Sequence, residues 1–163
     1  LLTDRELLKK DADYRMNPPL RTEKDRLAMI EALRDGTIDA IATDHAPHTP
    51  EEKADFLKAP NGSIGMETSF SASYTALVKT GVLTLPALIE RMSVRPAQIL
   101  GIEAGVIEAG APADIALIDE NAVWTVDPDK LHGKSRNTPF KGMTLHAKVR
   151  ATVCGGRIVY SEL

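Results

Sequence analysis

The chain has 163 residues, 43% of them hydrophobic and 26% charged, which are the proportions of an ordinary globular protein long enough to bury a core. The formal charge is -3, from 20 Lys and Arg against 23 Asp and Glu, so neither a nucleic-acid partner nor a strongly acidic tail is expected. No apolar run could cross a bilayer, so no membrane partner is expected, and the single cysteine, Cys154, excludes an internal disulfide and fits a reducing cytoplasm.

The N-terminal segment predicts a short helix followed by an extended stretch. Thr3 stands three residues before Glu6, a spacing typical of a helix N-terminus, and we expect this helix to end near Ala12. Two consecutive prolines disfavour helix in the residues before them, so residues 14–16 should be extended. The chain opens at Leu1 without an initiator methionine, and we therefore expect it to be a piece of a longer polypeptide.

An amphipathic helix and a buried strand are predicted next. Thr22 is a suitable N-cap, Gly36 is a suitable stop, and the apolar residues between them recur on one side of a helix. The apolar run over residues 38–43 lies between Gly36 and Pro47 and predicts a buried β-strand. This alternation of helix, strand and polar loop is typical of an α/β architecture.

The rest of the chain divides into a helical part and a β-rich part. Residues 49–65 form a long loop rich in charge, Pro and Gly, which is expected to be a functional lid or disordered. From Gly105 onward, short β-branched runs alternate with turn residues, so we predict a small β-structure and a domain boundary near residue 105. The expected helices cover residues 67–79, 85–92 and 96–100, and the expected strands cover residues 115–118, 123–126, 147–153 and 158–160.

Asp44, His45 and His48 follow directly after the predicted strand. The C-terminal ends of buried strands are where α/β-barrel enzymes keep their chemistry. A carboxylate in that place, followed by imidazoles, can bind zinc through oxygen and accept a proton from a metal-bound water. The structural alternative is that Asp44 caps the following turn and His48 packs against the loop.

Two further clusters allow both a functional and a structural interpretation. Asn17 precedes Pro18 and Pro19, which would hold its amide rigidly for an amide or imide ligand, or would simply form a turn. Residues 61–65, NGSIG, contain two glycines that would let the backbone approach a ligand closely, or would form a flexible hairpin tip. No phosphate-binding loop pattern is present, so a nucleotide site is not supported.

Three motifs together resemble those of bacterial-type dihydroorotases, which belong to the amidohydrolase superfamily: MNPPLR, TDHAPHTPEEK and APNGSIGMETSF, in this order and spacing. The later run GVIEAGAPADIALID is similar to the return of that superfamily into its small β-domain. The resemblance implies an α/β fold: the C-terminal part of a (β/α)8 TIM barrel over residues 1–105, then a small β-sandwich segment over residues 106–163. It also implies a cytoplasmic, zinc-dependent cyclic amidohydrolase that interconverts N-carbamoyl-L-aspartate and dihydroorotate in pyrimidine biosynthesis.

The resemblance implies a role for each matching residue. Asp44 would bind zinc, accept the proton of the attacking hydroxide and pass it to the departing nitrogen. Asn17 and His48 would contact the small-molecule substrate, as would Asn61 and Gly62 through their backbone. Asn61 stands where the family commonly has an aromatic residue, so packing of that side chain over the ligand is not implied.

The resemblance also implies that the other zinc ligands of the family would lie before Leu1, and His132 and His146, which fall in the β-rich part, do not replace them. We therefore expect the isolated chain to be inactive and to associate with the N-terminal half of the same enzyme or with further copies of itself. No role is assigned to His45. Two alternatives remain open: a non-catalytic dihydroorotase-like partner of aspartate transcarbamoylase, and a related hydantoinase or allantoinase.

Overall fold

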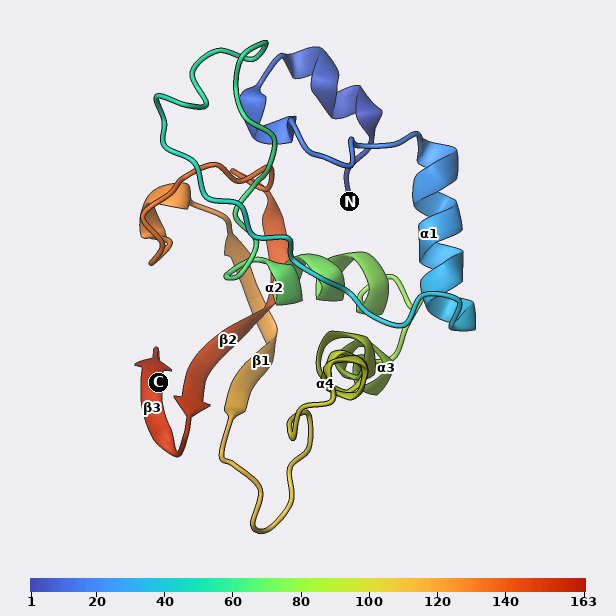
Figure 1. Cartoon of the computed structure of the whole chain (residues 1–163), viewed down its shortest axis with the longest axis vertical. Coiled ribbons are helices and arrows are strands. Elements are labelled where there is room, and N and C mark those ends of the chain that lie inside the picture. Colours follow the sequence, from blue (N-terminus) through green and yellow to red (C-terminus); the bar gives the residue numbers. More distant parts are fainter.

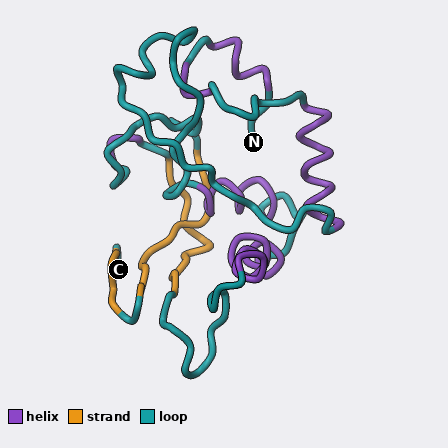
Figure 2. The backbone as a smooth tube through the Cα atoms, viewed as in Figure 1, coloured by secondary structure: helices purple, strands orange, loops and turns teal.

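A helical N-terminal part packs against a C-terminal antiparallel sheet in the computed structural model, which describes all residues from 1 to 163 (Figure 1). Long loops join the elements, above all between α1 and α2 (Figure 2). The helices are α1 (Glu23–Asp35), α2 (Ser69–Ser73), α3 (Leu85–Ile89) and α4 (Arg95–Leu100), with π-helical turns at Tyr74–Val78 and Glu90–Val94 and 3-10 helices at Asp4–Lys9, Ala12–Tyr14 and Pro128–Lys130; the strands are β1 (Ile115–Thr125), β2 (Thr144–Cys154) and β3 (Arg157–Ser161). No helix is long and apolar enough to span a membrane.

The first predicted helix is present as a 3-10 helix, Asp4–Lys9, but it is not capped as expected. Thr3 precedes it, and the Thr3 side chain makes no capping hydrogen bond. A second 3-10 turn, Ala12–Tyr14, enters the stretch that was predicted to be extended. That prediction is wrong at its start, because the Asp11 side chain accepts a hydrogen bond from a backbone N–H two residues on and begins a turn there.

Helix α1 begins and ends as predicted. The Thr22 side chain accepts a hydrogen bond from the Asp25 N–H while the Asp25 carboxylate accepts one from the Thr22 N–H, which forms a capping box. Gly36, at a φ of 85°, ends the helix. No residue of α1 is buried, and Leu27 and Met29 are 53% and 56% exposed. Part of its apolar side is therefore uncovered.

Residues 38–43 do not form the predicted buried strand. They have no regular secondary structure, and their side chains are half-buried or exposed. The Ile41 N–H donates to the carbonyl of Arg91, which lies in a helical turn and not in a strand. The prediction is wrong because a parallel strand needs a neighbouring strand, and this part of the chain has one isolated parallel bridge, between His45 and Ser63.

The helices between residues 69 and 100 are more continuous than predicted. Helix α2 runs directly into a π-helical turn, and α3 passes through a second π-helical turn into α4. The predicted break before Pro96 is wrong. Pro96 follows directly after the π-helical turn, in which the Arg95 N–H donates to the Glu90 carbonyl five residues back, so the missing N–H of Pro96 falls where the helical hydrogen-bond pattern changes.

The predicted β-rich part is confirmed as one antiparallel sheet with strand order β1-β2-β3. Two predicted strands, over residues 115–118 and 123–126, merge into β1, and the register shifts between Asp119 and Val123. The β-sandwich stays a prediction, because this single sheet is the only one present.

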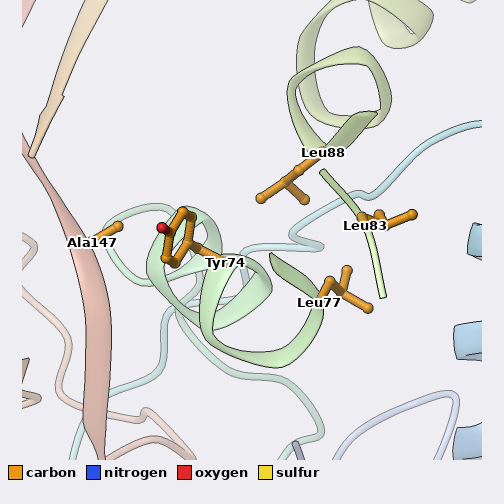
Figure 3. Close-up of a cluster of buried hydrophobic side chains, with 5 residues drawn as sticks. All are labelled: Tyr74, Leu77, Leu83, Leu88 and Ala147. Atoms are coloured by element: carbon orange, nitrogen blue, oxygen red, sulfur yellow. The ribbon is translucent and has the colours of Figure 1, made fainter. Parts of the chain in front are cut away.

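A buried apolar cluster joins the helices to the sheet (Figure 3). Leu88, on α3, is fully buried, and Ala147 of β2 lies at the sheet side of the cluster. The Ser71 hydroxyl donates to the Ala147 carbonyl at 2.7 Å, and the Trp124 indole N–H donates to the same carbonyl at 3.2 Å. The helices before residue 105 and the sheet after it thus share one buried core. The domain boundary near residue 105 stays a prediction. The cluster consists of Tyr74, Leu77, Leu83, Leu88 and Ala147.

Candidate functional site

Three segments that the sequence singled out are hydrogen-bonded to one another. We call them the Asn17 segment (residues 15–17), the Asp44 loop (residues 44–48) and the Gly62 loop (residues 61–65). The Ala46 N–H, in the Asp44 loop, donates to the Ser63 carbonyl at 2.8 Å. The Gly62 N–H donates to a carbonyl of the Asn17 segment, also at 2.8 Å. The fold therefore brings these three candidate regions together although the strand expected to carry the Asp44 loop is absent.

Asp44 is exposed, and its carboxylate makes no hydrogen bond or ion pair within the chain. Its backbone lies in the left-handed region, at a φ of 44°. Aspartate tolerates this conformation better than most residues, but a non-glycine residue held there is strained, and such strain is concentrated at functional sites. Asp44 therefore presents a free carboxylate at the start of its loop.

His48 is tied into its surroundings through both ring nitrogens. Nε2 lies 3.1 Å from the Asn61 carbonyl oxygen, and Nδ1 lies 3.2 Å from a carboxylate oxygen of Glu52. Both neighbours are acceptors, so the ring can donate to both only when each nitrogen carries a proton. The pKa of Glu52 is lowered, first by a hydrogen bond from the Thr49 backbone N–H and then by the one from His48. Both sides of the His48 ring are therefore occupied by acceptors within the chain.

His45, to which no role was assigned, joins the Asp44 loop to the Gly62 loop. Its Nδ1 accepts a hydrogen bond from the Gly65 N–H at 3.1 Å and a longer one from the Met66 N–H at 3.5 Å. Because Nδ1 accepts, the ring proton lies on Nε2. The ring lines a small pocket that also includes Pro47 and Ile64. Its role in this structure is to hold the two loops in register.

Gly62 is required for packing between the two loops. Its φ is 124°, and a Cβ at this position would lie 2.5 Å from the Cβ of Ala46. The sequence predicted a glycine that lets the backbone approach a ligand; the close neighbour in this structure is the Asp44 loop itself. Asn61 is exposed and uses its backbone carbonyl toward His48. Asn17 is exposed, and its side chain makes no hydrogen bond.

The long loop over residues 49–65 is anchored by two basic side chains. Lys53 Nζ donates to the carbonyls of Pro60 and Gly62, at 3.0 and 2.9 Å. Arg15, in the Asn17 segment, donates to the Phe56 carbonyl at 2.7 Å. Desolvation lowers the pKa of Lys53. The loop is therefore an ordered part of the site in this structure.

Asn137 is the residue of the site that sequence analysis missed. It lies in the loop between β1 and β2, and its amide bonds to the backbone of both the Asp44 loop and the Gly62 loop. It belongs to none of the three motifs, so no sequence signal identified it. Its partners are as many as 91 residues away along the chain, and only tertiary structure reveals them.

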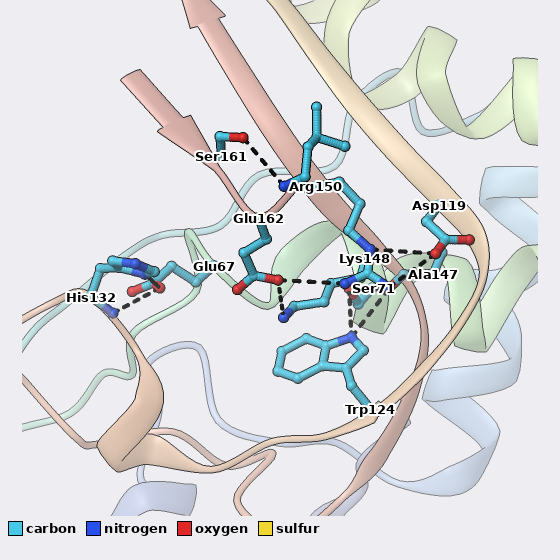
Figure 4. A network of polar contacts seen from close by, with 11 residues as sticks. Glu67, Ser71, Asp119, Trp124, His132, Ala147, Lys148, Arg150, Ser161 and Glu162 are labelled. Atoms are coloured by element: carbon cyan, nitrogen blue, oxygen red, sulfur yellow. Dashed lines mark hydrogen bonds and ion pairs between the residues drawn. The ribbon is translucent and has the colours of Figure 1, made fainter. Parts of the chain in front are cut away.

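A second link joins the site region to the β-rich part, at Glu67 (Figure 4). Its carboxylate accepts hydrogen bonds from the backbone N–H groups of His132 and Gly133, at 2.9 and 3.0 Å, and lies 3.0 Å from the His132 ring. Desolvation raises the pKa of Glu67, but these hydrogen bonds outweigh it, so the pKa of Glu67 lies below its usual value. The carboxylate therefore holds the 132–133 turn against the end of the Gly62 loop.

A complete metal site is not formed by this chain. No group of three or more His, Cys, Asp or Glu side chains is arranged to hold a metal ion. Asp44 offers one free oxygen ligand, whereas a zinc site in a hydrolase uses three protein ligands and an open position. Because the donors present do not fit the ion by themselves, no chemical step is assigned to a metal within this chain.

Comparison with known proteins gives matches along nearly the whole chain. The profile described as "Amidohydrolase family" matches residues 2–159. A protein of Geobacter metallireducens named dihydroorotase is 52% identical over 162 residues, and one of Bacillus caldolyticus with the same name is 48% identical over 163 residues. Each alignment covers 99% of this chain, which spans 38% of the length of either relative and corresponds to their C-terminal part.

Solved structures named as hydantoinases or dihydropyrimidinases share the fold. An L-hydantoinase from Arthrobacter aurescens is 29% identical with a TM-score of 0.92, covering 99% of this chain and 37% of that one. A dihydropyrimidinase from Brevibacillus agri is 28% identical with a TM-score of 0.85, covering 92% of this chain and 34% of that one. Together with the family match, these likenesses imply a fragment of TIM-barrel type.

Proposed function

Since this chain belongs to the amidohydrolase family, we propose that it is the C-terminal part of a dihydroorotase, and that Asp44 is its catalytic carboxylate. The observation that carries the proposal is the exposed, unpaired Asp44 at the start of a loop that is hydrogen-bonded to the other two predicted motifs. The relatives named dihydroorotase support the substrate class, N-carbamoyl-L-aspartate and dihydroorotate.

Asp44 would move the proton of the reaction. In the ring-opening direction, water adds to a ring carbonyl carbon and the bond from that carbon to the ring nitrogen breaks. The carboxylate takes the proton from the attacking water and returns it to the departing nitrogen, so that proton and charge balance over the cycle. A carboxylate with no partner in the chain is available for this exchange.

The neighbouring groups would bind and orient the substrate. His48 lies between two acceptors, and a ring N–H placed there can donate to a carboxylate of N-carbamoyl-L-aspartate. Asn17 has a free amide that can both donate to and accept from the ring amide. The backbone around Asn61 and Gly62 would line the ligand beside His48. A substrate carboxylate would replace Glu52 or the Asn61 carbonyl at the His48 ring.

Zinc is the proposed metal of the complete enzyme, with Asp44 as one ligand and the others supplied by the rest of the protein. When bound, zinc would supply Lewis acidity and an activated water. The proposed partner is accordingly the N-terminal part of the same enzyme, or further copies of the chain, and the uncovered side of α1 supports such a contact. A cytoplasmic location and an association with aspartate transcarbamoylase belong to this proposal as well.

A cyclic amidase acting on hydantoins is the second candidate. The likeness to hydantoinase structures, at a TM-score of 0.92, favours it. The higher identity to proteins named dihydroorotase, 52% against 29%, makes it the weaker candidate.

The test is activity of the complete enzyme, containing this chain and the rest of the protein, on dihydroorotate and on hydantoin. We expect hydrolysis of dihydroorotate, and we expect Asp44→Asn to lower kcat by about 10²- to 10⁴-fold, which is the usual contribution of general acid–base catalysis. Asp39→Asn is the matched control, because Asp39 is also exposed and belongs to none of the three hydrogen-bonded segments.

Two results would contradict the proposal. Activity on hydantoin without activity on dihydroorotate would favour the second candidate. Full activity of the Asp44→Asn enzyme would remove Asp44 from catalysis. The isolated chain is expected to retain no zinc on dialysis and to hydrolyse neither substrate.

A further inference from the structure

We propose that Asn137 is a positioning residue, which sets the spacing between the Asp44 loop and the Gly62 loop and thereby aligns Asp44 and His48 on the substrate. The identity of the substrate rests on the proposed function; the geometry does not. Asn137 contributes no chemistry of its own, and its effect is transmitted through the backbone of the two loops.

The Asn137 side chain is buried and fully bonded. The residue is 4% exposed. Its Nδ2 donates both protons, to the Ala46 carbonyl at 2.9 Å and to the Gly62 carbonyl at 3.2 Å. Its Oδ1 accepts a hydrogen bond from the His48 backbone N–H at 3.1 Å. One amide therefore fixes both loops at once.

The amide takes the place of a neighbouring strand. In a parallel pair, one residue of a strand accepts from the N–H and donates to the C=O of the two residues flanking its partner. The Asn137 side chain does this to the residues flanking Pro47: it donates to the Ala46 carbonyl and accepts from the His48 N–H. The Asp44 loop thus obtains, from a side chain, bonds that a strand would otherwise supply.

The backbone of Asn137 adds a separate contact. Its carbonyl accepts a hydrogen bond from the Ile64 N–H, in the Gly62 loop, at 3.0 Å. The next two residues, Thr138 and Pro139, are almost fully buried, with Thr138 at 1% exposed. The β1–β2 loop is therefore anchored at and directly after Asn137, which holds the Asn137 side-chain amide in place. Motion of the site loops relative to the β-rich part would have to break this set of bonds.

An amide is the group that satisfies all three side-chain bonds. Alanine would leave the Ala46 carbonyl and the His48 N–H without these partners, and the Gly62 carbonyl would keep only its hydrogen bond from Lys53. Aspartate keeps the acceptor for the His48 N–H but turns an anionic oxygen toward the two carbonyls that the amide had served. The two variants therefore separate the contact to His48 from the contacts that join the loops.

The experiment compares Asn137→Ala and Asn137→Asp in the complete enzyme, with Asn121→Ala as the matched control. Asn121 is exposed on β1, and its hydrogen bond to the Asp119 carboxylate uses the backbone N–H, which the substitution keeps. Steady-state kcat and KM on dihydroorotate are measured together with hydrogen exchange of the individual amides. The exchange of the Ile64 N–H is an internal control, because its bond goes to the Asn137 backbone and survives both substitutions.

A positioning role predicts separate changes in the readouts. Asn137→Ala should lower kcat/KM by about 10²-fold, the effect of a misplacement near 1 Å, and should speed exchange of the His48 N–H while the Ile64 N–H stays protected. Asn137→Asp should restore protection of the His48 N–H but not kcat/KM. Asn121→Ala should change neither.

Other results would overturn the proposal. An unchanged kcat/KM per folded molecule in both variants, with lower unfolding free energy, would make Asn137 merely structural. If Asn137→Ala does not fold, the volume-conserving variant Asn137→Asp tests the proposal by itself. Full kcat/KM in Asn137→Asp would contradict the positioning role. If the unsubstituted enzyme does not act on dihydroorotate, the proposed function fails, while the exchange of the His48 N–H still tests the positioning.

Discussion

The helix–sheet core and the site loops are held together in different ways. The core, which joins α2, α3 and β2, depends on buried apolar side chains such as Leu88, together with ladders of backbone hydrogen bonds. The Asp44 and Gly62 loops have almost no ladder, and their contacts come from individual polar side chains, Asn137, His45 and Lys53.

This difference separates stability from alignment. In the core, many apolar contacts of similar kind each contribute to stability, so a substitution there changes the free energy of unfolding of the whole chain. In the loops, one side chain serves two or three backbone groups, so a substitution shifts a local geometry and leaves most of the fold intact. Four substitutions, taken from the largest expected effect to the smallest, test this comparison.

Leu88→Ala should have the largest effect on stability. Leu88 is fully buried in the cluster shared by helices and sheet, and truncation of such a residue lowers the free energy of unfolding by about 2–5 kcal/mol. Urea unfolding followed by circular dichroism measures the change. Leu57→Ala is the control, because Leu57 is 81% exposed. A loss below about 1 kcal/mol for Leu88→Ala would contradict the role given to this core.

Gly62→Ala should disturb the site loops more than the fold. The added Cβ would lie 2.5 Å from the Ala46 Cβ, at a φ of 124° that alanine rarely adopts, and we expect a loss of about 1–3 kcal/mol with faster exchange of the Ala46 N–H. Gly142→Ala is the matched control, since its φ is also positive, 74°, and its Cβ would meet nothing within 4 Å. Equal losses would mean that backbone strain, and not contact between the loops, explains the effect.

Asp13→Asn should stabilise the chain at neutral pH. Desolvation, followed by repulsion from Asp11, raises the pKa of Asp13 from 3.8 to about 6. The folded state therefore binds the proton more tightly than the unfolded state, so stability falls as pH rises from about 4 to about 6 and is lowest above that window. With allowance for its partial exposure, removing the charge should add about 1 kcal/mol at pH 7 and nothing at pH 3.

Unfolding in urea at pH 3, 5 and 7 checks the Asp13 prediction. The gain from Asp13→Asn should grow across these three values. Asp39→Asn, at an exposed position, is the control and should show no such growth. A gain that is independent of pH would contradict the assignment to the Asp13 charge.

Glu67→Gln should have the smallest effect, at the contact between the two regions. The carboxylate accepts two backbone hydrogen bonds and one from the His132 ring, and the amide keeps one acceptor oxygen, so we expect a loss of about 0.5–1.5 kcal/mol at pH 7. Since the pKa of Glu67 is lowered, its contribution is present above the ordinary value of 4.5 and is lost as pH falls through the folded-state pKa.

The measurement for Glu67 is thermal unfolding at pH 7 and at pH 3. The difference between wild type and Glu67→Gln should shrink at the lower pH. Glu103→Gln, at an exposed position, is the control. A constant difference would mean that hydrogen-bond geometry, and not the charge, stabilises the 132–133 turn.

The sequence by itself determined the elements whose signals are local. Thr22 and Gly36 predicted the ends of α1, because capping depends on side chains within one turn of the helix terminus. The β-branched runs after residue 114 predicted the strands of the sheet, and three short motifs, in their order and spacing, predicted the family. These features need no knowledge of distant residues.

Tertiary structure alone decided the rest. An apolar run such as residues 38–43 becomes a strand only if another strand pairs with it, and the sequence of the run does not contain that information. Two separate helices were expected over residues 85–92 and 96–100, but a π-helical turn over Glu90–Val94 joins α3 to α4. Asn137 became part of the site through hydrogen bonds to residues 75 to 91 positions away. Capping and periodicity are short-range properties, whereas burial and pairing depend on which distant groups the fold brings within hydrogen-bonding distance.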